Sequence, residues 1–373
     1  MRIDRSTHPA YQLSGDLGLA PGIYPYLGAA VGPDGLRAAV ASCGTAAVPG
    51  RAGVRLAGEV HGRSLIDPAV YDPSDDRTQD LPQDPLWPCD EWLDRQRAAG
   101  VPLLLTDSPR IARGDRPALR RALQRWDSVS EPVVVVLPIE SWWLRAGLPC
   151  LTEEVSAAGR PVGLVLMHHY NALDAAGSVA GLLAFVSAVG GQLPVVVPRC
   201  DISAVGAVAH GAFAGFVGMS ARLRHGPMPV RLTREAVGEP REQDLTPAVL
   251  VPALHDYYKA SRLPAFSRAD QNLLRCDYSC CRGESLLEIS RMCEVSIAAA
   301  RQRAYSHHIG VHEGIAREVL GAAEPTDAWW ERCKAGADTA AALIEVGVSL
   351  PVSRWLRQWL ELGSPSHDPV MVG

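Results

Sequence analysis

The apolar segments PVVVVL at residues 132–137 and VGLVLM at residues 162–167 decide the fold of this chain. Neither segment alternates apolar with polar residues, as a strand with one face in water would. Strands covered on both faces read as continuous Val- and Leu-rich runs, and they belong to parallel sheets joined by crossover helices. Four further runs share this character: 101–106, 194–197, 215–218 and 248–251. The sequence therefore predicts a parallel α/β sheet.

Two weaker candidate strands, 36–41 and 54–66, bring the number of predicted strands to about eight. Helical patterns at 117–126 and 177–189 fall between the runs, as crossover helices would. No Gly-x-Gly-x-x-Gly or Gly-Lys-Ser/Thr loop follows an early strand, which argues against a dinucleotide-binding or P-loop fold. We therefore predict a TIM-like (β/α)8 barrel in preference to a doubly wound open sheet.

The character of the chain changes after residue 264, where a cysteine cluster and a long helical pattern at 284–307 begin. Two further helices are predicted around four tryptophans: Trp329, Trp330, Trp355 and Trp359. We predict a barrel with an N-terminal extension over 1–265, and a zinc-binding subdomain with C-terminal helices over 266–373.

The composition indicates a soluble globular protein, with 47% hydrophobic and 21% charged residues among 373. No apolar run reaches the roughly 20 residues that span a bilayer, and the N-terminus lacks a secretory pattern, so we predict a cytoplasmic protein without a membrane partner. The net charge of −5 argues against non-specific coating of nucleic acid but leaves room for a local basic face. With only Lys259 and Lys334 as lysines, Schiff-base chemistry is disfavoured.

The cysteines Cys276, Cys280 and Cys281 cluster, and His307 and His308 follow on the predicted helix. Three thiolates and one imidazole make a closed tetrahedral zinc site, which is structural because no ligand position stays open. Adjacent cysteines can both bind the metal only if the backbone bends sharply, so either Cys280 or Cys281 is a possible bystander. The alternative is a set of free buried thiols beside a solvent-exposed histidine pair.

Carboxylates follow several predicted strands, where a β/α barrel has its active site. Asp107 comes directly after 101–106, and the others are Glu140, Asp201 and Asp256. Two carboxylates facing one pocket can divide the roles of nucleophile and proton carrier at a sugar C1′. For Asp107 alone, the competing interpretation is a helix cap or turn.

Basic groups also lie near the predicted mouth of the barrel. An arginine-rich stretch at 110–125 suits phosphate-backbone binding, or else forms a solvated helix face. Arg222, Arg224 and His225 follow the strand at 215–218, where barrels often hold phosphates. His168 ends another strand and could contact a base or sugar, or belong to the core.

The combination resembles the tRNA-guanine transglycosylase superfamily, which exchanges bases in queuosine and archaeosine biosynthesis and has a DNA-modifying branch. That family's zinc motif reads Cys-x-Cys-x-x-Cys with a later His, and Cys276, Cys281 and His307 match three of its positions. Tyr278 stands at the second position, and Cys280 is the candidate replacement. Thr106-Asp107-Ser108 matches half of the family's Thr-Asp-Ser-Gly-Gly motif, without its glycines.

The resemblance implies a divergent base-exchange enzyme that replaces guanine in tRNA, with DNA as the second choice, by a 7-deazaguanine. It implies Asp256 as the nucleophile, Asp107 as the general acid/base, a structural Zn²⁺ and a purine or 7-deazapurine base as ligand. The oligomeric state stays open on the sequence, with a homodimer as one candidate. The predicted substrate contacts are Ser108, Glu140, His168, Gly218 and Arg222.

Two other functions stay open on the sequence. A catalytically silent relative would keep the barrel and the zinc while binding nucleic acid or a partner protein. A barrel enzyme for a small phosphorylated metabolite would use the 222–225 loop for the phosphate and show no affinity for polynucleotide.

Overall fold

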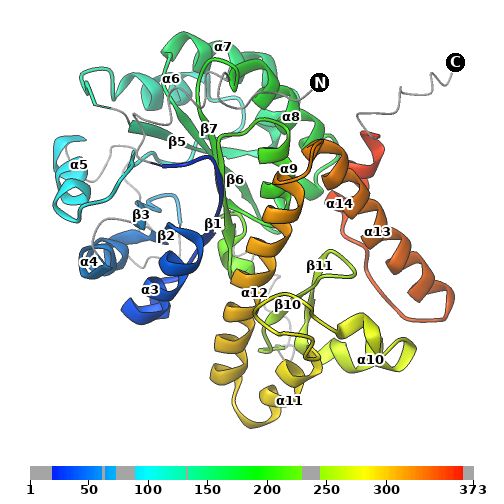
Figure 1. The fold of residues 1–373 in the computed structure, drawn as a ribbon. Helices are drawn as coiled ribbons and strands as arrows, with labels where there is room; N and C mark the ends of the chain where they lie inside the picture. The colour runs from blue at the N-terminus through cyan, green and yellow to red at the C-terminus, as the bar shows by residue number, and fades with distance from the viewer. Residues whose placement is uncertain (1–18, 61–63, 73–88, 132, 229–243, 364–373) are drawn as a thin grey trace, which may run out of the picture.

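The structure is a computed structural model that describes residues 19–60, 64–72, 89–131, 133–228 and 244–363. Eight parallel strands form its centre (Figure 1). They are β1 (Gly22–Tyr26), β2 (Ala46–Pro49), β3 (Ser64–Asp67), β4 (Leu104–Leu105), β5 (Val133–Glu140), β6 (Val162–His168), β7 (Val195–Cys200) and β8 (Ala214–Gly218).

The strands follow the order β3-β2-β1-β8-β7-β6-β5-β4, so the sheet closes through the pairing of β1 with β8. β3 and β4 stand at the two ends of this order and lie against each other without a shared ladder. The predicted (β/α)8 architecture is therefore confirmed as a nearly closed barrel. A short strand, β9 (Gly226–Pro227), pairs with the end of β6.

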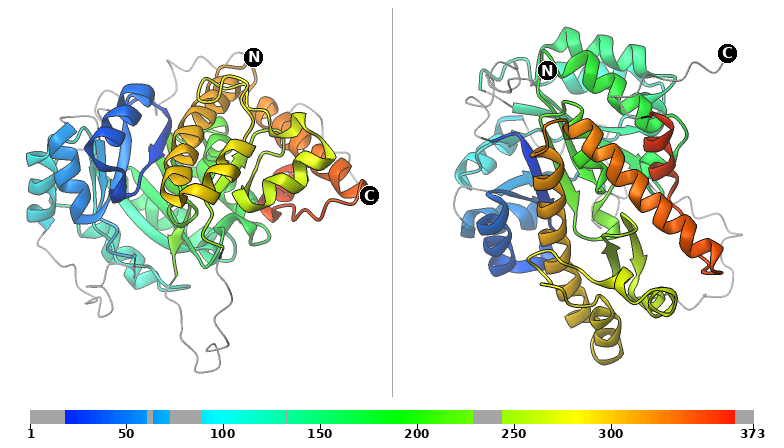
Figure 2. Two further views of the ribbon diagram at one scale, coloured as in Figure 1. Left: turned by 90° about the horizontal axis from the view of Figure 1, so that it is seen from below. Right: turned by 45° about the vertical axis from the view of Figure 1, so that its right-hand side comes forward.

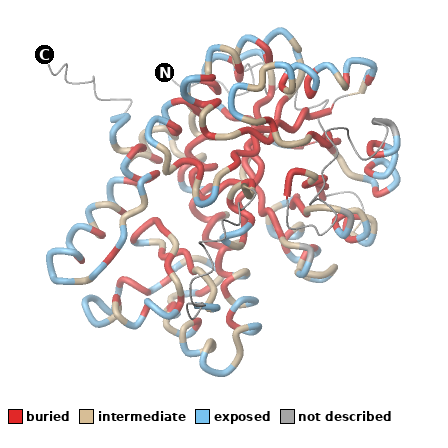
Figure 3. The backbone as a smooth tube through the Cα atoms, turned by 180° about the vertical axis from the view of Figure 1, so that it is seen from behind, coloured by how far each residue is buried: buried red, intermediate tan, exposed pale blue. Residues whose placement is uncertain are grey.

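The helices between the strands cover the outside of the barrel. They are α3 (Gly32–Cys43), α4 (Gly50–Val60), α5 (Cys89–Ala98), α6 (Arg116–Gln124), α7 (Leu148–Ala158), α8 (Ser178–Val189) and α9 (Ser203–Ala209). Along β5, Val134 and Val136 belong to the inner core with Tyr26 and Phe216, whereas Val133 and Val135 pack in the outer core with the helices. Both faces of a central strand are thus buried, which explains its unbroken apolar sequence (Figure 3).

Three predicted strands are corrected. Residues 36–41 lie in α3, whose buried Leu36 and Ala39 follow a helical spacing. Of 54–66, the first part is α4 and only the last residues enter β3. Residues 248–251 form β10 (Ala248–Val251), which pairs antiparallel with β11 (Asp256–Lys259) outside the barrel. The true first strands, β1 and β2, are short and contain prolines, so they lack a continuous apolar signal.

The predicted helix at 284–307 is two helices, α11 (Leu287–Val295) and α12 (Ile297–Leu320). The break falls at Ser296, whose side chain caps α12 by accepting a hydrogen bond from the Ala299 amide. α12 packs against β1 and α9, the place of the barrel's closing helix, and continues past the barrel beside β10 and α11 (Figures 1 and 2).

The remaining helices are α10 (Leu263–Ala269), α13 (Pro325–Glu345) and α14 (Arg354–Glu361). The two predicted tryptophan-containing helices are α13 and α14, and Trp329, Trp355 and Trp359 on them are buried. The domain boundary at 265 stays a prediction.

None of the helices in the described ranges combines the length and apolar character that crossing a membrane requires. The N-terminal residues, which were predicted to lack a secretory pattern, lie outside the described residues.

Candidate functional site

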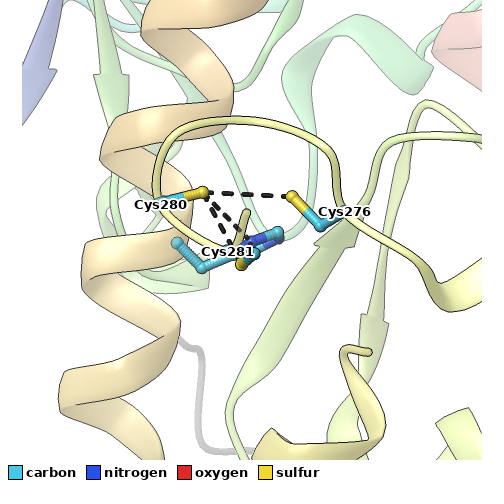
Figure 4. A group of neighbouring side chains, drawn as sticks. Cys276, Cys280 and Cys281 are labelled. Carbon is cyan, nitrogen blue, oxygen red and sulfur yellow. Dashed lines mark hydrogen bonds between the residues drawn. The ribbon is translucent and has the colours of Figure 1, made fainter. Parts of the chain in front are cut away.

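The cysteine cluster and His307 converge on one point (Figure 4). Their ligand atoms all lie within 4.8 Å of one another. Cys280 Sγ is 3.9 Å from Cys276 Sγ and 3.7 Å from Cys281 Sγ, and Cys281 Sγ is 3.3 Å from His307 Nδ1. A tetrahedral ion with Zn–S bonds of about 2.3 Å would set its sulfur atoms about 3.8 Å apart. The four side chains therefore form a group that can hold a metal ion.

A tight turn lets the adjacent cysteines point the same way. The amides of Cys281 and Arg282 both donate to the Tyr278 carbonyl, and Gly283 returns to Cys276 by an amide-to-carbonyl bond of 2.8 Å. The loop lies close to α12 because Gly310 has no side chain: a Cβ there would stand 2.6 Å from the Cys280 Cβ. Cys280 and Cys281 both belong to the group.

Hydrogen bonds outside the cluster orient its ligands. His307 Nε2 lies 2.7 Å from the Leu250 carbonyl, so it donates there and leaves Nδ1 facing the thiols. Arg303 donates to the Cys280 carbonyl at 3.1 Å and to Cys281 Sγ at 3.5 Å. Hydrogen bonds from Cys276 and Cys280 lower the pKa of Cys281, which favours its thiolate.

His308 does not belong to this group, because both of its ring nitrogens are engaged by the backbone. Its Nε2 accepts from the Leu250 amide at 3.2 Å, and its Nδ1 donates to the Met219 carbonyl at 2.9 Å. His308 thus ties β10 to the chain leaving β8.

A cavity of about 480 Å³ opens at the carboxyl ends of β6, β7 and β8. This is where β/α barrels place their active sites, and the size suits a small organic group. The lining comes from five parts of the chain: His169, Tyr170 and Asn171; Asp201; Ala221, Arg222, Arg224 and His225; Asp256 and Tyr257; and Ser353 and Trp355.

Two buried carboxylates face this cavity. Asp201 accepts hydrogen bonds from the Ser203 amide at 2.8 Å and from the Asn171 side chain. Asp256 accepts from the Tyr257 amide at 2.7 Å and from Ser353 Oγ at 2.6 Å. Each carboxylate is therefore held in a fixed orientation.

Burial shifts both carboxyl groups toward the protonated form. It raises the pKa of Asp256 to about 7, and the neighbouring charge of Asp201 adds to this rise. The pKa of Asp201 is also raised by burial, against the hydrogen bonds from Ser203 and Asn171. A carboxyl group that titrates near neutral pH can both give and accept a proton during a reaction.

This shift predicts a stability effect for Asp256→Asn. The folded state holds the Asp256 proton up to pH about 7, whereas the unfolded chain loses it near pH 4, so this stabilising contribution is complete below pH 4 and lost as the pH rises to 7. The asparagine variant buries no charge at any pH. Its free energy of unfolding relative to wild type should therefore rise between pH 4 and 8, by up to about 4 kcal/mol.

Urea unfolding at several pH values measures this difference, and Asp34→Asn, at an exposed position on α3, is the control. An Asp256→Asn difference that is independent of pH would show that the carboxyl is ionised normally in the folded protein.

Arg224 is placed in the cavity by the loop that follows β8. Arg224 Nε donates to the Gly218 carbonyl at 3.2 Å, and its guanidinium carbon lies 3.3 Å from the centre of the Tyr257 ring. Gly218 permits this fold-back, because a Cβ there would lie 2.3 Å from the Leu223 carbonyl. Gly218 does not appear in the cavity lining, so its observed role is to shape the loop. The buried Arg199 holds the same loop by donating to the Arg222 carbonyl at 2.9 Å.

Asp107 lies outside the residues that line the cavity. It is buried after β4, and Arg125 Nη1 lies 3.2 Å from its Oδ1. Burial raises the pKa of Asp107 to about 6, while Arg125 opposes the rise. Asp107 is not the cap of α6, because Asp115 holds that position and accepts from the Ala118 amide.

Of the other predicted substrate contacts, Arg222 lines the cavity, whereas Glu140, His168 and Ser108 are not among its lining residues. Glu140 pairs with Arg110 at 3.6 Å, His168 accepts from the Tyr170 amide at 3.1 Å, and Ser108 is buried beside Thr106.

Much of the arginine-rich stretch is neutralised within the molecule. Arg116 and Arg120 both bind Glu154, and Arg116 also binds Glu153.

Asn171, Tyr257 and Ser353 had no sequence signal as site residues. Asp201 had one, since it directly follows a strand, but no motif separated it from the other strand-end carboxylates.

A scan against models of protein families gives no match for this chain, and a search of curated protein sequences gives none either.

Proposed function

We propose that the chain is a base-exchange glycosyltransferase, similar in chemistry to the tRNA-guanine transglycosylases. The observation that carries this proposal is the pair of buried carboxylates, Asp201 and Asp256, in one cavity at the mouth of a β/α barrel. Cleavage and re-formation of a glycosidic bond with a covalent intermediate needs two such groups.

In the proposed reaction the Asp201 carboxylate attacks C1′ of the target nucleotide, and the bond from C1′ to the base nitrogen breaks. The electron pair of that bond stays with the leaving base, which takes the proton of Asp256. Asp256 then accepts a proton from the incoming base, whose nitrogen attacks C1′ and releases Asp201. The pKa of about 7 suits Asp256 to carry this proton in both directions.

This assignment differs from the one that the family resemblance implies, in which Asp256 is the nucleophile and Asp107 the acid/base. Asp201 replaces Asp107 in the pair because Asp201 lines the cavity with Asp256, whereas Asp107 is paired with Arg125.

The substrate in this proposal is a nucleotide within tRNA, in preference to DNA. A target base must leave its stack to reach a barrel pocket, and aromatic side chains commonly receive it. Tyr170, with 77% of its surface exposed, stands in the cavity lining and supplies such a ring.

The metal in this proposal is Zn²⁺, held by Cys276, Cys280, Cys281 and His307. Three thiolates and an imidazole are donors that zinc prefers, and four protein ligands leave no position for substrate. Bound there, the ion would join the 276–281 loop to α12 and so serve structure.

Exchange of labelled guanine into nucleic acid tests the function. The protein is incubated with radiolabelled guanine and either total tRNA or duplex DNA, and label in the precipitated polymer is counted. We expect time-dependent incorporation into tRNA. Binding of tRNA without incorporation of guanine or of a 7-deazaguanine would favour the catalytically silent alternative.

A second candidate is an enzyme for a small phosphorylated metabolite, which the basic loop after β8 favours. Arg222, Arg224 and His225 all line the cavity from that loop. Absence of any affinity for tRNA or DNA, with binding of sugar phosphates, would support this function instead.

A further inference from the structure

Arg224 is a buried cation without an ion pair in the described part of the chain. It is only 9% exposed, yet no carboxylate oxygen there lies within 4.0 Å of its guanidinium. Its Nε is satisfied by the Gly218 carbonyl, whereas its Nη2 has no hydrogen-bond partner. Buried charges in proteins are normally paired, whereas the guanidinium of Arg224 contacts the face of the Tyr257 ring instead.

The two carboxylates of the cavity do not provide the missing partner. Asp201 and Asp256 each already accept hydrogen bonds on both oxygen atoms, from Ser203 and Asn171 and from Tyr257 and Ser353. They act on Arg224 only through longer-range attraction.

A second guanidinium stands on the same wall. Arg222 lines the cavity with 63% of its side chain exposed, and its Nη2 is 3.8 Å from Asp72 Oδ1. Asp72 is also bound at 3.1 Å by the buried Arg199, so one carboxylate faces two arginines. Asp67 also stabilises the charge of Arg199, and Arg222 keeps exposed N–H donors on the same wall as Arg224.

We propose that Arg224 and Arg222 form a phosphate-ester subsite in the cavity. A phosphate offers several acceptor oxygens, which would satisfy the exposed donors of Arg222 and bring negative charge to the guanidinium of Arg224 in the cavity wall. The subsite comes from the loop after the last barrel strand, a place where β/α barrels hold phosphates. In the context of the proposed function, on which this part rests, the phosphate belongs to the nucleotide whose C1′ faces Asp201.

Equilibrium binding of inorganic phosphate to the full-length protein tests the subsite without any requirement for catalysis. Isothermal titration calorimetry is run on wild type, Arg224→Gln, Arg222→Gln and the control Arg121→Gln, at an exposed α6 position outside the cavity lining. We expect Arg224→Gln to raise the Kd about tenfold or more, Arg222→Gln to raise it about threefold to tenfold, and the control to match wild type.

Wild type that does not bind phosphate, or cavity variants with an unchanged Kd, would overturn the subsite. Circular dichroism checks the fold of each variant. If Arg224→Gln does not fold, wild-type binding and the exposed Arg222→Gln still decide the outcome.

Three competitors identify the source of the phosphate: a sugar monophosphate, guanosine 5′-monophosphate, and a short single-stranded RNA. Displacement by any of them with the same arginine dependence supports the subsite. Preference for RNA agrees with base exchange, whereas preference for the sugar monophosphate keeps the subsite and rejects base exchange. The experiment can therefore reject the phosphate subsite and the base-exchange function independently of each other.

Discussion

Cys281→Ser is expected to lose the bound metal and to lower the Tm by about 10 °C or more. Cys281 is buried within the four-residue group, 3.3 Å from His307 Nδ1, and serine oxygen is a poor ligand for zinc at this geometry. Because the ligands come from the 276–281 loop and from α12, binding free energy at this site is also folding free energy. Elemental analysis of the purified protein and thermal unfolding measure both effects.

The matched control for this variant is Cys293→Ser. Cys293 lies on α11 outside the cluster, where its thiol donates to the Ile289 carbonyl at 3.2 Å. It should retain one equivalent of metal and a Tm close to wild type. A chelator should lower the Tm of wild type to that of Cys281→Ser and leave Cys281→Ser unchanged. If wild type and Cys281→Ser contain equal metal, the cluster is a set of free thiols.

Asp201→Asn and Asp256→Asn should each reduce guanine exchange by about 1,000-fold or more, for different reasons. Asp201→Asn removes the nucleophile, so no covalent adduct forms. Asp256→Asn removes the proton carrier, so the adduct can form but turnover falls. Exchange rates with labelled guanine, and trapping of the protein–RNA adduct on a denaturing gel, separate the two variants.

Asp107→Asn distinguishes this assignment from the one implied by the family resemblance. With Asp201 and Asp256 as the pair, Asp107→Asn should keep exchange within about tenfold of wild type, because its carboxyl is paired with Arg125. Loss of exchange in Asp107→Asn together with full activity in Asp201→Asn would return the acid/base role to Asp107. Binding of phosphate by each variant confirms that the cavity is intact.

The central strands were predictable because their burial leaves a local signal. β5 and β6 are apolar along their length since one face meets the inner core and the other meets the helices. β1 contains Pro25, and β2 has only four residues, so the sequence of neither strand can be distinguished from that of a loop. The segment at 248–251 shows the opposite error: it is buried and apolar, but it pairs in a hairpin.

The cysteine cluster leaves a local signal in the sequence, whereas the cavity does not. Three cysteine ligands lie within six positions of the chain, so their chemistry is visible locally. The cavity joins Asn171, Asp201, Arg224, Asp256 and Ser353, which only the closed barrel and the chain after it bring together. Their position after predicted strands marked Asp201 and Asp256 as candidates in the sequence. The burial of Arg224 in the cavity wall is visible only in the structure.

The position of α12 has a consequence for the order of folding. The helix that covers β1 and α9 begins at Ile297, so the whole hairpin and cysteine loop lie between β8 and the helix that completes the barrel. Contacts between α12 and β1 join residues almost 300 positions apart, and such contacts are slow to form because long loops must close first. A metal ion that joins the cysteine loop to His307 shortens the last of these loops. Metal bound by the cysteine loop and His307 would therefore be expected to speed the closure of the barrel after synthesis, besides adding to its final stability.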